Sequence, residues 1–65
     1  MVQTNYTRPE LEEAHRALTS TLHKCEKMRE SPKLGASQRT LLERRIKALQ
    51  ISLTLIGKKL EEETP

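Results

Sequence analysis

Apolar residues recur at helical spacing in two separate segments of the chain. In the first segment, steps of 3, 4, 3, 4 and 3 join the apolar or small residues Leu11, Ala14, Leu18, Thr21, Cys25 and Met28, and Leu22 widens this seam. In the second segment, steps of 4, 3, 4, 3 and 4 join Leu42, Ile46, Leu49, Leu53, Ile56 and Leu60. Residues spaced in this way lie on one face of an α-helix. The pattern therefore predicts two amphipathic helices with seams of coiled-coil spacing.

The first helix begins at a strong capping signal. Thr7 and Glu10 have the Thr-x-x-Glu spacing of a capping box, in which each side chain satisfies a backbone N–H group of the other residue. Pro9 lies in the first turn, where its missing N–H group costs nothing. Pro32 disfavours helical geometry at the residue before it. We therefore expect the first helix over about 7–30.

The second helix follows a short linker, 31–36. Ser37 is a favourable N-cap, so we expect this helix over about 37–62. A linker this short forces consecutive helices to be antiparallel neighbours. The sequence thus predicts an all-α fold, a single antiparallel two-helix hairpin over 7–62. The remaining residues are expected to form a flexible N-terminal tail and a C-terminal tail, 1–6 and 63–65.

The two seams pair in one register. When the chain is folded about the linker, positions whose numbers sum to 67 face each other, as Leu18 faces Leu49 and Cys25 faces Leu42. Every seam residue from Thr7 to Cys25 finds a partner in this register. We therefore expect Cys25 to act as a small buried apolar residue rather than as a reactive thiol.

The second helix also carries an apolar stripe outside its seam. Arg44 interrupts this stripe, whose members are Leu41, Ala48, Ile51 and Leu55. A helix that is apolar over most of its circumference is normally buried on more than one side. The chain has 65 residues, a single cysteine and one aromatic residue, so its own core must be small. These features predict a homodimer that forms a four-helix bundle through the second helix. The alternatives are another protein partner, or exposed apolar residues without a role.

Charge is unevenly distributed along the hairpin. Residues 24–47 hold eight basic and three acidic side chains, a net charge of +5, whereas the rest holds four basic and six acidic side chains, a net charge of −2. The basic tip comprises Lys24, Lys27, Arg29, Lys33, Arg39, Arg44, Arg45 and Lys47. It suggests an alternative function, a nucleic-acid-binding accessory protein that contacts phosphates. With no aromatic stacking platform and only two helices, an interaction module is favoured instead.

The residue types used in catalysis and metal binding do not converge in the sequence. His15 and His23 lie eight residues apart, and His23 and Cys25 fall on different helix faces. Zinc needs three or four convergent ligands. No Gly-rich phosphate loop is present, so no reaction, cofactor, metal or small-molecule substrate is expected. The lack of a long apolar run and the single cysteine favour a cytoplasmic protein without a membrane association.

Three segments of the hairpin carry a resemblance to known proteins: Lys24-Cys25-Glu26-Lys27, Ser37-Gln38-Arg39-Thr40-Leu41-Leu42 and Arg45-Ile46-Lys47-Ala48-Leu49. Through them, the stretch 20–60 resembles short uncharacterised proteins of Gram-positive bacteria, a resemblance that implies no assigned activity. The chain is also similar to the helical-hairpin phosphatases of sporulation response regulators in length, hairpin form and the Ser-Gln opening of its second helix. Their motif continues with Leu-Asp, whereas Thr40 and Leu41 stand here, so the acidic catalytic residue is missing.

Overall fold

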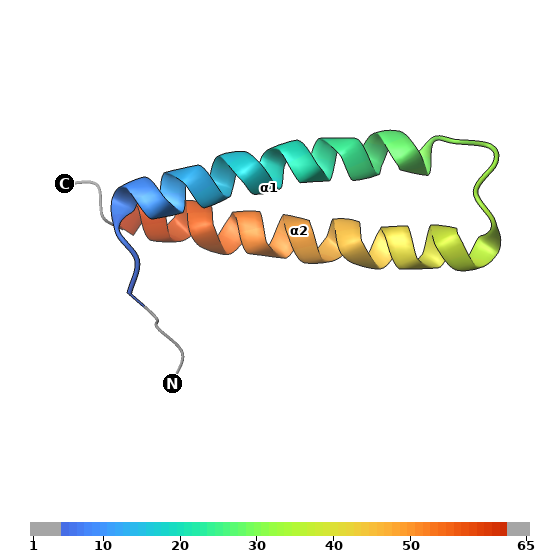
Figure 1. The fold of residues 1–65 in the computed structure, drawn as a ribbon. Coiled ribbons are helices and arrows are strands. Elements are labelled where there is room, and N and C mark those ends of the chain that lie inside the picture. The colour runs from blue at the N-terminus through green and yellow to red at the C-terminus, as the bar shows by residue number, and fades with distance from the viewer. Residues whose placement is uncertain (1–4, 63–65) are drawn as a thin grey trace.

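The computed structural model of the protein describes residues 5–62 as two α-helices that pack side by side in an antiparallel hairpin (Figure 1). Helix α1 spans Arg8–Arg29 and helix α2 spans Ala36–Glu62. The described part of the chain contains no strand, so the all-α hairpin is confirmed, with each helix end within one residue of its prediction. Residues 1–4 and 63–65, which make up most of the predicted tails, lie outside the described residues.

The predicted capping box is present at the start of α1. The backbone N–H of Thr7 donates to Oε1 of Glu10 at 2.8 Å, and the backbone N–H of Glu10 donates to Oγ1 of Thr7 at 3.3 Å. The Thr7 hydroxyl also donates to the same carboxylate at 3.0 Å. Because hydrogen bonds from the backbone and then the side chain of Thr7 favour the ionised form, the pKa of Glu10 lies below its ordinary value of 4.5. Local chemistry alone therefore fixes this helix end.

The prediction that Ser37 caps α2 is wrong. The helix begins at Ala36, so Ser37 already lies within its first turn. The backbone N–H of Arg39 donates to the carbonyl oxygen of Gly35 at 2.9 Å, which makes Gly35 the residue that precedes the helix and accepts its first hydrogen bond. Glycine is tolerated in this position because the capping residue needs non-helical backbone angles more than it needs a side chain.

Two arginine side chains join the helices at opposite ends of the hairpin. Nη1 of Arg39 donates to the carbonyl oxygen of Arg29 at 3.2 Å, beside the loop. Nη1 of Arg8 donates to the carbonyl oxygen of Leu60 at 3.3 Å, beside the other end. Both pairs have residue numbers that sum to 68, within one residue of the predicted register. Both carbonyl groups belong to the last turns of their helices, which lack partners within the helix.

The core lies between the helices and is small. Only Leu11, Leu42 and Ile46 are buried among the described residues, with exposed fractions of 8%, 4% and 3%. The remaining seam residues of α2 are half-buried, namely Leu49, Leu53, Ile56 and Leu60. All six predicted seam residues of α2 therefore avoid full exposure, as expected for the face that packs on α1.

The predicted seam of α1 is wrong at two positions. Thr21 is exposed and its hydroxyl donates to the carbonyl oxygen of Ala17 at 3.0 Å, while Met28 is 54% exposed. Leu22 is half-buried in place of Thr21, so the seam takes a step of four from Leu18. An α-helix has 3.6 residues per turn, which lets such a step replace one of three. The larger apolar side chain gains more from leaving water. Cys25 is half-buried rather than fully buried.

Removing the N-cap of α1 should destabilise the hairpin. We expect Thr7→Ala to lower the free energy of unfolding by about 0.5–2 kcal/mol, because it leaves orphan backbone N–H groups at the helix start. Urea unfolding followed by circular dichroism at a fixed protein concentration measures this. Thr21→Ala is the matched control, since its hydroxyl bonds only within the helix and should cost little. Equal destabilisation by both variants would contradict the capping argument.

The same cap should make stability depend on pH. Because the pKa of folded Glu10 is lowered, its ionised form stabilises the hairpin above about pH 4.5, and this contribution is lost as the pH falls through the lowered pKa. Glu10→Gln keeps the shape and removes the charge. We expect the wild type to melt at a higher temperature than this variant at pH 7, and the difference to vanish in strong acid. A difference that stays constant from pH 7 to pH 2 would refute the assignment.

Candidate interaction surfaces

The second apolar stripe of α2 lies on the outside of the hairpin. Leu41, Ile51 and Leu55 are 45%, 50% and 62% exposed, and Ala48 is exposed as well. Helical spacing of three, four and seven residues places the four on one side of α2, away from the buried Leu42 and Ile46. We call these four residues the α2 stripe. Helix α1 does not cover them.

The loop end adds further apolar surface next to the α2 stripe. A shallow depression is lined by Met28 of α1, by Leu34 of the linker, and by Gln38, Leu41, Leu42 and Arg45 of α2. Leu41 therefore belongs to both the stripe and this loop-end depression. The depression was not predicted from the sequence, because Met28 was expected in the seam of α1. The signal that would have found it is the step from Leu18 to Leu22, which turns Met28 away from α2.

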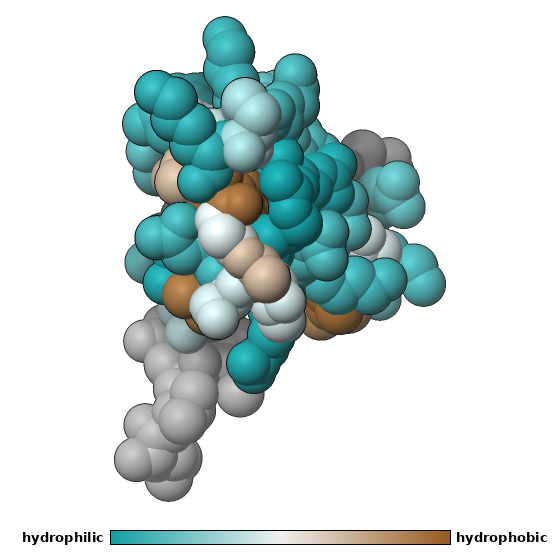
Figure 2. Space-filling view, turned by 90° about the vertical axis from the view of Figure 1, so that its right-hand side faces the viewer, coloured by the Kyte–Doolittle hydropathy of each residue, from teal (hydrophilic) through white to brown (hydrophobic). Residues whose placement is uncertain are grey.

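The basic tip collects around the loop from both helices. Lys24, Lys27 and Arg29 lie in the last two turns of α1, Lys33 in the linker, and Arg39, Arg44, Arg45 and Lys47 in the first half of α2. Seen from the loop end, the surface is mostly hydrophilic, with apolar residues in small separate areas (Figure 2). Arg39 is half-buried and the other seven residues are exposed. The structure thus places the predicted basic residues at one end of the molecule.

The ion pairs of the described residues lie at the start of α1, away from the loop. Arg8 pairs with Glu12 at 3.4 Å and Arg16 pairs with Glu13 at 3.8 Å, all with exposed side chains. Exposed pairs of this kind contribute little to stability. They therefore leave the charge contrast between the two ends of the hairpin as the main electrostatic feature.

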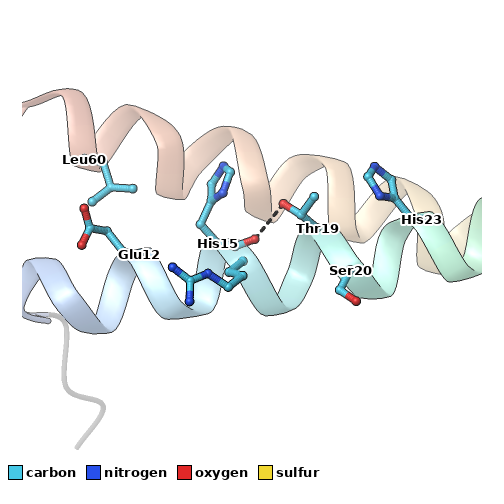
Figure 3. A pocket seen from close by; sticks show the side chains of 7 residues that line it. Glu12, His15, Thr19, Ser20, His23 and Leu60 are labelled. Atoms are coloured by element: carbon cyan, nitrogen blue, oxygen red, sulfur yellow. Dashed lines mark hydrogen bonds between the residues drawn. The ribbon is translucent and has the colours of Figure 1, made fainter.

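A groove lined mainly by polar residues, called the polar groove below, runs along α1 between its second and fifth turns. It is lined by Glu12, His15, Arg16, Thr19, Ser20 and His23 of α1 and by Leu60 of α2. His15, Thr19 and His23 follow one another at steps of four, and both histidines project toward the α2 side (Figure 3). The hydroxyl of Thr19 donates to the carbonyl oxygen of His15 at 2.7 Å. The residues that the structure describes contain no group of three or more side chains arranged to hold a metal ion.

The sequence predicted no shared site for the two histidines, whereas in the structure both line this groove. Their common four-residue step through Thr19 was the available signal. The groove is open to solvent along its length.

Within residues 5–62, neither helix combines the length and apolar character needed to cross a bilayer. Comparison of the chain with protein-family models, with curated proteins and with solved structures finds no match. The resemblances drawn from the sequence therefore stay predictions.

Proposed function

We propose that this chain is a small non-enzymatic interaction module that associates with a second copy of itself through the α2 stripe, forming a four-helix bundle. The observation that carries the proposal is the exposure of Leu41, Ile51 and Leu55 on a molecule with only three buried residues in its described part. A cytoplasmic location, and the lack of any cofactor or small-molecule substrate, belong to the same proposal and stay predictions.

The energetic argument starts from the size of the core. A single core in a chain shorter than about 70–80 residues rarely supplies more than about 3–5 kcal/mol, and this one contains no disulfide. Full burial of a leucine or isoleucine side chain is worth about 1.5–3 kcal/mol. Leu41, Ile51 and Leu55 of the α2 stripe are between 45% and 62% exposed, so the single hairpin obtains only part of this burial free energy. A partner that covers the stripe would recover it.

A second copy is the partner that best fits this surface. A two-fold symmetric contact uses the same patch on both subunits, so one exposed stripe is sufficient to build it. Antiparallel hairpins pair readily into four-helix bundles because each contributes two helices of similar length. Another protein with an apolar helix would fit the same stripe, and the experiment below separates the two cases.

Acidic substitutions in the α2 stripe should abolish the dimer. We expect sedimentation equilibrium to give twice the 7.5 kDa chain mass for the wild type, and the monomer mass for Ile51→Glu/Leu55→Glu at micromolar concentration. Burial of two unpaired carboxylates in the interface would cost more than the contact returns.

Gln50→Glu/Thr54→Glu provides the matched control, because these exposed residues lie one position earlier on α2 and receive the same charge. This variant should remain a dimer. A wild-type chain that is fully helical and monomeric at tens of micromolar would refute self-association and leave another protein as the occupant of the stripe.

A nucleic-acid-binding function is the second candidate, and the geometry of the loop end favours it. The hydrogen bond from Arg39 to the Arg29 carbonyl brings basic residues of both helices together beside Lys33. Such a cluster binds phosphates by releasing counterions, without reading base sequence. The absence of Trp and Phe from the chain leaves only this electrostatic contribution.

Fluorescence anisotropy with a short DNA duplex tests this candidate. Binding should weaken steeply with salt, and Arg39→Gln/Arg44→Gln/Arg45→Gln should remove it and flatten the salt dependence. Arg16→Gln/Lys58→Gln/Lys59→Gln removes the same charge away from the tip and should bind nearly as the wild type does. No binding at about 50 mM salt would end this proposal.

A further inference from the structure

We propose that the second copy docks tip to base: the loop end of one hairpin lies beside the open end of the other, with a two-fold axis passing through Ala48. This inference rests on the proposed self-association and adds the orientation of the partner and the pairs of residues that meet. Three observations carry it, which are the symmetry of the α2 stripe, the distribution of charge, and the loop-end depression.

Three of the four residues of the α2 stripe are symmetric about Ala48, while Ile51 has Arg45 as its counterpart. Leu41 precedes Ala48 by seven residues and Leu55 follows it by seven, so each lies about 10 Å from Ala48 along the helix. A two-fold axis perpendicular to α2 at Ala48 therefore brings Leu41 of each copy opposite Leu55 of the other. The small side chain of Ala48 lets the two helices approach closely where they cross. All four positions of this stripe are exposed and ready to be covered.

Apolar spacing alone also permits the tip-to-tip orientation, in which each residue meets its own copy. Charge decides between the two. Tip to tip, two regions of net charge +5 would lie side by side, whereas tip to base places each of them beside a region of net charge −2. Arg44 also favours the tip-to-base orientation. It interrupts the α2 stripe, so in the tip-to-tip dimer it would face the Arg44 of the second copy, a like charge. In the tip-to-base dimer, it faces the second copy's Ser52.

The loop-end depression gives an independent reason for the same orientation. Leu55 is the most exposed large apolar residue described, at 62%, and lies toward the open end of α2. The depression that contains Met28, Leu34 and Leu41 lies at the loop end. Only the tip-to-base arrangement brings the second copy's Leu55 to this depression, where its side chain would cover the exposed Met28. The tip-to-tip arrangement would place two depressions against each other.

Cross-linking of single-cysteine variants tests the orientation. In a Cys25→Ala background, Ser37→Cys and Lys59→Cys place thiols at two exposed positions that extend the α2 stripe at either end without altering its apolar residues. These positions lie 22 residues apart, about 33 Å along the helix, so a short bis-maleimide cannot span them within one copy. Tip to base, an equimolar mixture of the two variants should give a cross-linked heterodimer, and each variant alone should stay uncross-linked.

Ala48→Cys in the same background separates the failure of this inference from failure of the proposed function, because Ala48 meets its own copy in either orientation. Cross-linking of Ala48→Cys together with self-cross-linking of Ser37→Cys alone would overturn the tip-to-base orientation and keep self-association through α2. If Ala48→Cys also fails to cross-link and the chain sediments as a monomer, both proposals fall. Circular dichroism of each variant before cross-linking shows that the helices are retained.

Discussion

The apolar contact between α1 and α2 is the constraint on which the rest of this structure depends, and it is centred on Leu11, Leu42 and Ile46. These side chains come from the start of α1 and from the first half of α2, so they anchor opposite ends of the hairpin. The two arginine side chains that reach a carbonyl group of the other helix then hold these ends together. Everything between them is half-buried at best, which leaves a contact one side chain deep.

Because this contact is thin, most of the surface of both helices faces solvent. Each helix of a hairpin has one neighbour, so more than half of its circumference faces solvent. On α1, this surface carries mostly polar residues, among them those of the groove of His15, Thr19 and His23, and one large exposed apolar residue, Met28. On α2, it carries leucine and isoleucine instead. The proposed contact with a second copy is therefore assigned to α2, which has more apolar surface than its neighbouring helix covers.

The sequence predicted most of the fold because its signals are local. The capping box of Thr7 and Glu10 needs only residues within one turn, and its hydrogen bonds form as expected. The start of α2 was predicted less well, because Ser37 has a favourable capping side chain, whereas Gly35 caps the helix through its backbone alone. Thr21 and Met28 were misplaced for another reason. After Leu18 the seam can continue three or four residues later, at Thr21 or at Leu22. Which of the two packs on α2 depends on tertiary contacts, which the periodicity of the sequence does not show.

The surfaces divide in the same way. The sequence predicted an exposed α2 stripe, because α2 has more apolar residues than one neighbouring helix can cover. In the structure the stripe residues are exposed. The loop-end depression and the polar groove each combine residues of both helices, and the depression also uses the linker. Their composition depends on the rotation of each helix about its own axis, so they became visible only in the folded molecule.

The hairpin topology places the start of α1 and the end of α2 at the same end of the molecule (Figure 1). Helix α2 has 27 residues and is about 40 Å long, so the loop projects that far from the paired helix ends. Any domain, tag or surface joined to either helix end would therefore be attached on one side. In a single hairpin the linker lies at the other side, at a distance set by the length of α2.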